Sequence, residues 1–298
     1  MKNIYPVIIL IILALLTLSA CGPVADSASA APVPPAETQR AIQNKGSDTL
    51  VNLALAWAER YRQLNPSVAI AVTGGGSGTG IAALINGTVD IANASRKMKD
   101  DEIAQAKANG IEPVEFVVAI DALAVVVHPD NPVSQLTIDQ LADMFAGRIT
   151  NWREVGGRDA PIILLSRETN SGTHVYFLEE VVRKGSKDNK DIFAPQTLLM
   201  PSSVGITSEI RRNPNAIGYD GLGYVTDHEK MIAVAKNADS PYVLPSVQSG
   251  ADGSYPIARD LYMYTAGQPD EVIAKYLAWI RGPEGQQIVS DLGFVPLK

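Results

Sequence analysis

Three short segments rich in glycine, serine and threonine set the strongest constraint on how this chain can fold. They cover residues 46–49, 74–80 and 167–173, and each stands where a helix is expected to begin. A helix N-terminus carries unsatisfied N–H donors and the positive end of the helix dipole, so it favours an anion. If the three helix starts converge, they would surround a small oxyanion.

Apolar residues recur along the chain at helical spacing in some stretches and in short strand-length runs in others. Helices are expected over residues 49–64, 81–85, 103–108, 137–145, 203–212 and 271–280. Strands are expected over residues 68–72, 89–92, 116–120, 123–127, 162–166, 216–225 and 260–265. This alternation predicts an α/β protein with mostly parallel sheets.

The same alternation predicts two lobes with a ligand cleft between them. Strand and helix patterns resume after residues 120–121 and again after residues 224–225, so the chain is expected to cross between lobes at these two points. The first lobe would comprise residues 41–120 and 226–298, and the second lobe residues 121–225.

The N-terminal residues have the pattern of an export signal. Ile4–Leu18 are almost unbroken apolar sequence, and Leu18–Cys21 resembles a bacterial lipobox. A membrane-spanning helix, the alternative, needs about 20 apolar residues, more than this run offers. We expect a lipoprotein signal peptide over residues 1–20, a lipid on Cys21, and a disordered tether over residues 21–40 that is rich in Ala, Pro and Ser. The expected location is extracytoplasmic, with a lipid anchor in the cell membrane, on its periplasmic or outer face.

Charge and cysteine content narrow the class of protein. The formal net charge of −7 argues against a nucleic-acid partner, which requires clustered Lys and Arg. It does not argue against an anion site, because fixed dipoles in a dehydrated site can bind an anion on an acidic protein. Cys21 is the only cysteine, so no disulfide can form within the chain.

The common catalytic and nucleotide-binding motifs are not present. Ile81 stands where G-x-x-x-x-G-K-[ST] requires lysine, and Thr79 replaces the last glycine of G-x-G-x-x-G. Ser77 comes nearest to the G-x-S-x-G motif of esterases but does not satisfy it. The three histidines are too scattered for a zinc motif. The sequence therefore predicts a protein that is not an enzyme and has no catalytic residue, metal or cofactor.

Two arginines are candidates for binding an anion directly. Arg167 ends an expected strand shortly before Ser171–Thr173, so its guanidinium could bind two anion oxygens while the helix-opening N–H groups approach as well. The alternative for Arg167 is a surface ion pair with Glu168. Arg96, which follows Ser95, could supply a second positive charge, or it could belong to a solvated basic turn with neighbouring lysines.

Five segments together resemble the periplasmic phosphate-binding proteins, the substrate-binding subunits of bacterial phosphate ABC transporters. They are Gly46–Thr49, Gly76–Gly80, Asp90–Arg96, Arg167–Thr173 and Ala216–Tyr219, in the order that the family has. The resemblance implies a two-lobed periplasmic-binding-protein fold of type 2, with phosphate held between the lobes. The residues that would bind phosphate are Ser47, Asp48, Thr49, Ser77, Ser95, Arg96, Arg167, Ser171, Gly172 and Thr173.

The resemblance does not assign the group that accepts the proton of hydrogen phosphate. Some members of the family have an aspartate where this chain has Arg96, and that carboxylate rejects sulfate, which has no proton to donate at neutral pH. Asp48 and Glu168 are the candidates here. The resemblance also implies a monomer that delivers inorganic phosphate to membrane permease subunits. The alternatives are a binding protein for another oxyanion, a lipid-anchored phosphate sensor, or a secreted phosphate-ester hydrolase.

Overall fold

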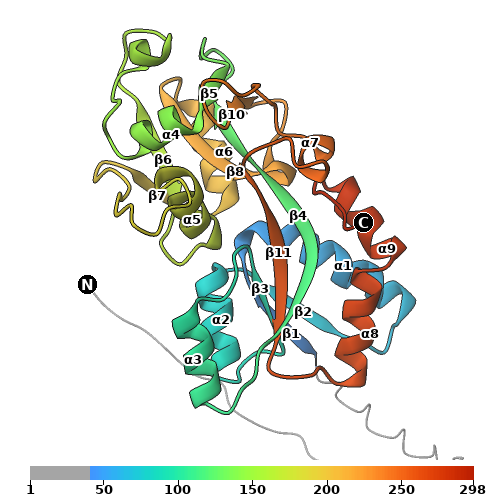
Figure 1. Cartoon of the computed structure of the whole chain (residues 1–298). Helices are drawn as coiled ribbons and strands as arrows, with labels where there is room; N and C mark the ends of the chain where they lie inside the picture. Colours follow the sequence, from blue (N-terminus) through green and yellow to red (C-terminus); the bar gives the residue numbers. More distant parts are fainter. Residues whose placement is uncertain (1–40) are drawn as a thin grey trace, which may run out of the picture. The chain divides into compact units, whose positions relative to one another are not determined.

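The computed structural model describes residues 41–298, which form an α/β protein with two lobes (Figure 1). The predicted fold class is thereby confirmed. The expected signal peptide, the lipidation site at Cys21 and the tether lie outside the described residues. Within residues 41–298, no helix combines the length and the apolar character needed to cross a bilayer.

The first lobe combines elements from the start and the end of the described chain. Its strands are β1 (Ile42–Gly46), β2 (Ile70–Thr73), β3 (Ile91–Ala94), β11 (Ala258–Thr265) and the first half of β4 (Val114–Val127). Its helices are the 3-10 turn η1 (Asp48–Leu50), α1 (Val51–Leu64), α2 (Ser77–Ile85), α3 (Asp100–Ala108), α8 (Glu271–Ile280) and α9 (Pro283–Asp291). The strand order is β2-β1-β3-β11-β4, and β11 is antiparallel to both of its neighbours.

The second lobe contains the middle of the chain. Its strands are the second half of β4, β5 (Gln135–Thr137), β6 (Ile163–Arg167), β7 (Leu198–Met200), β8 (Ala216–Gly221), β9 (Lys230–Met231) and β10 (Ala233–Ala235). Its helices and helical turns are α4 (Ile138–Phe145), η2 (Trp152–Val155), α5 (Gly172–Phe177), the π-helical η3 (Leu178–Val182), α6 (Ser203–Arg212), η4 (Leu222–Tyr224) and α7 (Val247–Ala251). The main sheet has the order β4-β8-β6-β7.

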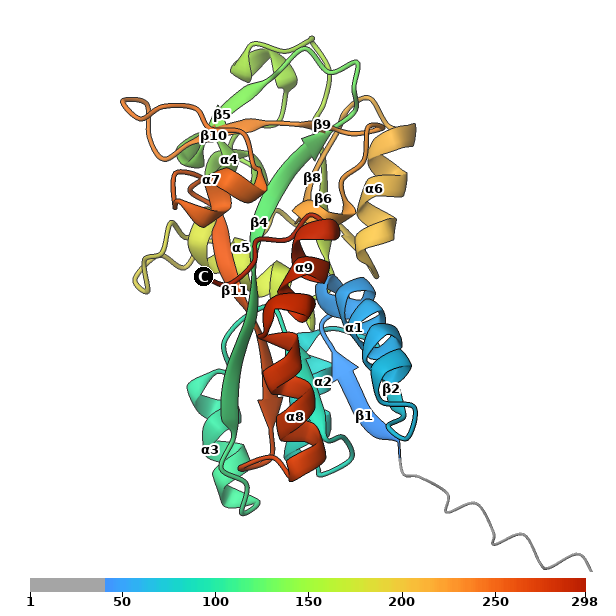
Figure 2. The ribbon, with the colours of Figure 1, turned by 90° about the vertical axis from the view of Figure 1, so that its right-hand side faces the viewer.

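One long strand, β4, belongs to both lobes (Figure 2). Residues 114–122 pair with β11, and residues 123–127 pair with β8, so the hydrogen-bonded strands form one connected path through both lobes. The sequence predicts two separate strands here. The structure has one because Asp121, the polar residue between them, is fully buried and forms an ion pair with Arg259 of β11.

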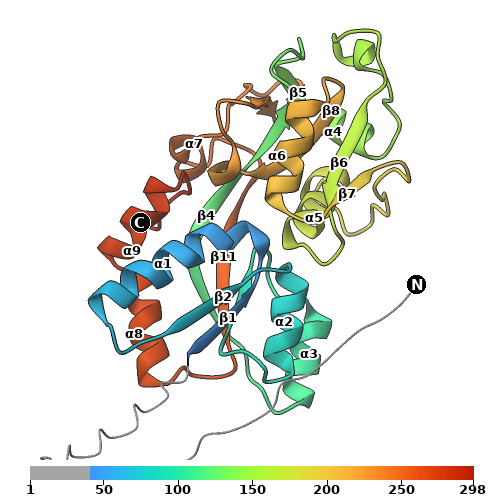
Figure 3. The same ribbon diagram turned by 180° about the vertical axis from the view of Figure 1, so that it is seen from behind.

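Alternate side chains of β11 contribute to two different cores of the first lobe, as expected for a strand covered on both faces. Leu261 and Met263 join the apolar cluster that includes α1 and α8. Tyr262 and Tyr264 join the cluster that includes α2 and α3. The first-lobe sheet therefore lies between two layers of helices (Figure 3).

The second half of β4 divides its side chains in the same way. Leu123, Val125 and Val127 are buried with residues of α4, α5 and η3. Ala124 and Val126 are buried with residues of α6. Because both faces are buried, this part of the strand is an almost continuous hydrophobic run. β6 and β8 are parallel, so the loops that leave them emerge at the same end of the sheet.

The segment before β11 lies with the second lobe, although the sequence pattern predicts that residues 226–298 belong to the first. β9 pairs with the second half of β4, and β10 runs parallel to β5. Ile232, Val234 and Ile257 are buried in the same cluster as Phe145 of α4. These strands are too short to show a periodicity in the sequence, and Ile232 and Val234 are buried in a cluster made mainly of second-lobe residues. The chain returns to the first-lobe sheet at β11.

Candidate functional site

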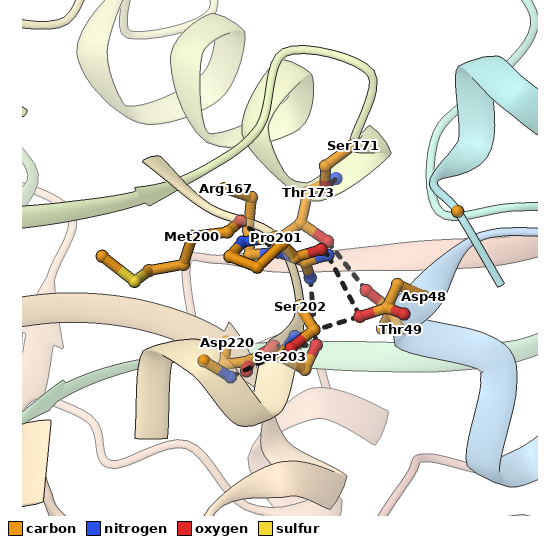
Figure 4. Close-up of polar contacts among 12 residues, drawn as sticks. Asp48, Thr49, Arg167, Ser171, Thr173, Met200, Pro201, Ser202, Ser203 and Asp220 are labelled. Carbon is orange, nitrogen blue, oxygen red and sulfur yellow. Dashed lines mark hydrogen bonds and ion pairs between the residues drawn. The ribbon is translucent and has the colours of Figure 1, made fainter. Parts of the chain in front are cut away.

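The first residues of four helical elements meet where the lobes touch. η1 and α2 belong to the first lobe, and α5 and α6 belong to the second (Figure 4). The turn into η1 requires glycine at Gly46, which has a φ of +145°, and a Cβ there would lie 2.2 Å from the carbonyl oxygen of Asn93. The close passage of this turn against β3 brings Ser47 and Asp48 to the edge of the sheet. We call this meeting point the interlobe junction.

Arg167, the last residue of β6, is fixed at the junction by contacts within its own lobe. It is 1% exposed. Its Nε donates to the carbonyl of Met200 at 3.3 Å, and its Nη2 donates to the carbonyl of Pro201 at 3.1 Å. Its Nη1 donates to Ser203 Oγ at 3.0 Å. These hydrogen bonds hold the guanidinium in one orientation.

Asp48 connects the two lobes through Arg167. Its Oδ2 accepts from Arg167 Nη2 at 3.1 Å and from the backbone N–H of Ser203 at 3.0 Å. Ser203 is the first residue of α6, so the carboxylate also lies at the positive end of that helix. Glu168, which the sequence offers as the alternative partner of Arg167, is exposed. The long-range pair forms in place of the local one.

Hydroxyl groups from both lobes line the junction. Thr49 Oγ1 and Thr173 Oγ1 lie 2.8 Å apart, and Ser77 Oγ and Ser95 Oγ lie 3.3 Å apart. All four residues are buried. Ser47 is buried as well, and its Oγ has no hydrogen-bond partner among residues 41–298. Buried polar groups are rarely left unpaired, so a missing partner is a signal of a binding site.

Gly172 brings the start of α5 against the serines of the first lobe. A Cβ on Gly172 would lie 2.4 Å from Ser77 Oγ and 2.6 Å from Ser95 Oγ. Ser171, the N-cap of α5, accepts from the backbone N–H of Thr173 at 3.2 Å. The start of α5 therefore lies directly against the first-lobe hydroxyls, and Ser171 caps the N–H groups of Thr173 and His174.

Asn170 holds the lobes together beside the junction. Its carbonyl accepts from the N–H of Gly78 at 2.9 Å, and its side-chain Nδ2 donates to the carbonyl of Gly75 at 2.9 Å. A Cβ on Gly76 would lie 2.8 Å from the carbonyl oxygen of Asn170. Residues 74–80 of the first lobe thus form the surface that contacts residues 167–173 of the second lobe. The two lobes touch at this surface, so the structure is in a closed arrangement.

Arg96 is engaged elsewhere. Its Nη1 and Nη2 donate to the two carboxylate oxygens of Glu102 at 2.7 and 2.6 Å, and Nη1 also donates to the carbonyl of Lys97. Lys97 and Lys99 are exposed, whereas the Arg96 side chain is only 9% exposed. Arg96 is therefore paired with a local carboxylate and does not belong to a solvated basic turn. Its buried Nε has no hydrogen-bond partner within residues 41–298, so its role as a second ligand charge stays a prediction.

Asp220 of β8 is a buried acid that the sequence motifs do not single out. Its Oδ1 accepts from Ser203 Oγ at 2.8 Å and from the N–H of Gly221 at 2.9 Å. Burial raises the pKa of Asp220 to about 7, although nearby Arg167 acts in the opposite direction. The only signal in the sequence is a lone carboxylate within the otherwise uncharged extended segment 216–225.

Arg259 and Asp121 are a second buried pair that the motifs do not reveal. Nη2 of Arg259 donates to Asp121 Oδ2 at 2.9 Å, and also to Thr173 Oγ1 at 2.8 Å. Arg259 is 6% exposed, and Asp121 is fully buried. The signal for Asp121 in the sequence is again a single carboxylate between two apolar runs.

The structure brings most of the sequence-predicted residues to the junction. Those residues are Ser47, Asp48, Thr49, Ser77, Ser95, Arg167, Ser171, Gly172 and Thr173. Hydroxyls, helix-terminal N–H groups and a guanidinium are all hydrogen-bond donors, and a site built mainly of donors suits an anion. Within residues 41–298, no group of three or more His, Cys, Asp and Glu side chains could hold a metal ion.

Similarity to known proteins extends over nearly the whole described chain. A family model described as a PBP superfamily domain matches residues 31–284. The phosphate-binding protein PstS of Pseudomonas aeruginosa PAO1 is 36% identical over 311 residues, which cover 96% of this chain and 94% of that protein. PstS of Bacillus subtilis 168 is 33% identical, with 85% of this chain and 79% of that protein covered.

Solved structures show the same fold. A substrate-binding protein from Clostridium perfringens with bound phosphate has a TM-score of 0.78 at 30% identity, covering 87% of this chain and 100% of that one. An ABC-type phosphate transport receptor from Vibrio cholerae has a TM-score of 0.69, also at 30% identity, covering 86% of this chain and 100% of that one.

Proposed function

Because this chain belongs to the PBP superfamily, and within it to the family of PstS phosphate-binding proteins, we propose that it captures inorganic phosphate outside the cytoplasm and delivers it to the permease of an ABC transporter. The names of its relatives describe binding and transport, and the protein is a substrate-binding protein, not an enzyme. We propose that it acts as a monomer.

The proposal rests above all on the convergence of donors from both lobes at the interlobe junction. Gly172 lies so close to Ser77 and Ser95 that no side chain fits between them. Thr49 and Thr173 meet across the same boundary. An oxyanion held here would accept hydrogen bonds from both lobes at once, so it would stabilise the closed arrangement over an open one.

Arg167 is the residue that supplies positive charge to the anion. A guanidinium has five N–H donors. The hydrogen bonds to Met200, Pro201, Ser203 and Asp48 use one hydrogen of Nε, one of Nη1 and two of Nη2. One hydrogen of Nη1 is left for a ligand, and the rigid placement of the group lowers the entropy cost of using it.

Asp48 is the acceptor that we propose for the proton of hydrogen phosphate. It lies at the junction, and its contacts with Arg167 and Ser203 both use Oδ2, so neither of them engages Oδ1. Glu168 is exposed and makes a poorer candidate. Fully ionised sulfate has no proton to donate, so it would leave the carboxylate facing an anion without a hydrogen bond.

Competition titration with phosphate and sulfate tests the ligand and the acceptor together. The purified protein should bind phosphate and strongly prefer it to sulfate at neutral pH. Asp48→Asn should reduce that preference by roughly tenfold or more, since the amide can donate to sulfate. Glu168→Gln is the matched control and should leave the preference unchanged.

Three outcomes would count against this proposal. Equal affinity for sulfate in the wild-type protein would leave only a general oxyanion-binding protein. An unchanged preference in Asp48→Asn, or a reduced one in Glu168→Gln, would remove Asp48 from the acceptor role.

The membrane attachment is a separate proposal that depends on the N-terminal sequence. Leu18–Cys21 has the small residues of a lipobox before its cysteine, and we propose that Cys21 carries the lipid. Cys21→Ser should move the protein from the membrane fraction to the soluble fraction of the cells that express it. Retention in the membrane fraction would show that a different segment anchors the chain.

A further inference from the structure

Arg259 occupies the place where the chain passes between the lobes. It lies on β11, directly opposite Asp121 of β4 in the antiparallel register. Its Nε and Nη2 donate to Asp121 Oδ2 at 3.3 and 2.9 Å, and Asp121 Oδ1 accepts from the N–H of Leu222 at 3.2 Å. The pair therefore links the middle of β4, the start of β11 and Leu222, the first residue of η4.

The pair is a costly arrangement for stability alone. Arg259 is 6% exposed, Asp121 is fully buried, and Nη1 of Arg259 has no hydrogen-bond partner within residues 41–298. The guanidinium carbon lies 5.2 Å from the ring centroid of Tyr176. Because replacing a buried ion pair by apolar residues is often neutral or stabilising, a pair with an unpaired nitrogen calls for a functional explanation.

A hydrogen count shows what Arg259 does to the junction. A guanidinium only donates, so Thr173 Oγ1 must accept the 2.8 Å hydrogen bond from Nη2. The hydroxyls of Thr173 and Thr49 have one hydrogen each, and their mutual 2.8 Å contact uses one of the two. The other hydrogen remains to be donated to a third group. An oxyanion requires that kind of partner.

We propose that Arg259 is a positioning residue for phosphate binding: it acts through Thr173, by occupying an acceptor site of that hydroxyl and fixing it so that the Thr173–Thr49 pair offers its spare hydrogen to the anion. The inference rests on the proposed function. It differs from the role of Arg167, which is held by its own lobe and by Asp48. Thr49 belongs to the first lobe and Thr173 to the second, and Arg259 lies at the start of β11, where the chain returns to the first lobe, so the arrangement links this return of the chain to lobe closure.

A double-mutant cycle tests whether Arg259 acts through Thr173. Removing Arg259 alone would leave Asp121 buried and unpaired, so the pair is changed together, as Asp121→Asn with Arg259→Gln. Phosphate affinity is measured by calorimetry in the wild type, the pair variant, Thr173→Val, and the combination of all three substitutions. Melting without phosphate checks that each protein is folded.

The expected result is strong coupling. The pair variant should bind phosphate about tenfold more weakly than wild type, but add less than a twofold loss when Thr173 is already valine. A second pair variant, Asp121→Leu with Arg259→Met, should give the same coupling without polar groups. The matched control is the ion pair between Arg211 and Glu229, whose carboxylate is buried and whose arginine lies in the last turn of α6, away from the junction. Changing both of these residues to Gln should leave the phosphate affinity unchanged.

Equal losses in the two backgrounds would overturn the inference, because Arg259 would then act independently of Thr173. An unchanged affinity in both pair variants would overturn it too. These results differ from a failure of the proposed function, in which the wild-type protein itself shows no heat of binding with phosphate.

Discussion

Arg167 and Arg96 each follow a serine at the end of a strand, and they pair with carboxylates at very different distances along the chain. Arg167 pairs with Asp48, 119 positions earlier and on the other lobe. Arg96 pairs with Glu102, six positions later and at the start of the next helix. The first pair joins the lobes, while the second belongs entirely to the first lobe.

Glu102 accounts for the difference. It is the third residue of α3, and it also accepts from the N–H of Lys99 at 2.8 Å, so its position is fixed by the helix start. Both of its oxygens bind Arg96, through Nη1 and Nη2 of the guanidinium, and such a two-bond contact between arginine and carboxylate is among the stronger ones. Around Arg167 the neighbours are mostly carbonyls and a hydroxyl. Both arginines thus have a carboxylate partner, but Glu102 engages two nitrogens of Arg96 with both of its oxygens, whereas Asp48 engages one nitrogen of Arg167 with one oxygen.

The largest expected effect is a difference in phosphate affinity between a variant of Arg167 and a variant of Arg96. Arg167→Ala should weaken binding roughly a hundredfold, about 3 kcal/mol, because it removes a charge-assisted donor and leaves Asp48 unpaired beside the anion. Arg96→Ala should change the affinity less than twofold, since its charge is already neutralised by Glu102. Calorimetric titration of the two variants and the wild type measures both.

Similar phosphate affinities in the two variants would contradict the distinction between Arg167 and Arg96. A tenfold loss in Arg96→Ala would mean that Arg96 leaves Glu102 when phosphate binds. Wild-type affinity in Arg167→Ala would remove Arg167 from the site. Melting temperatures without phosphate show whether either variant has lost its fold.

The elements that carry the site could be predicted from the sequence because each is a local pattern. The predicted helices over residues 203–212 and 271–280 are confirmed as α6 and α8. The Gly-, Ser- and Thr-rich segments stand at helix starts, as predicted, because small residues and N-caps are properties of a few neighbouring positions.

The pairings between distant segments could not be predicted in this way. Asp121 and Arg259 are 138 positions apart, and they meet only because of the register between β4 and β11. The same holds for Asp48 and Arg167. Even the local pair of Arg96 and Glu102 depends on where α3 begins, which propensity alone locates only within a few residues. Such contacts depend on tertiary structure.

Asp220 is a titratable neighbour of Arg167, and it gives a smaller expected effect, a pH dependence of the stability. Burial raises the pKa of Asp220 from an ordinary value of 3.8 to about 7. Between these values the folded protein keeps a proton that the unfolded chain releases. The contribution of Asp220 to stability is therefore complete below about pH 4 and is lost as the pH rises toward 7.

Asp220→Asn should remove this dependence, because the amide oxygen can still accept from Ser203 and Gly221 and carries no charge at any pH. The free energy of unfolding of the variant, relative to wild type, should rise by roughly 1 kcal/mol for each pH unit from about 5 to 7, and then level off. Urea unfolding of both proteins without phosphate at pH 5, 6, 7 and 8 measures the difference, in which other titrating groups cancel. A difference that stays constant across this range would show that Asp220 is already ionised at pH 5 beside Arg167. The electrostatic balance at the junction would then depend on the three charges of Asp48, Arg167 and Asp220, and not on the binding of a proton.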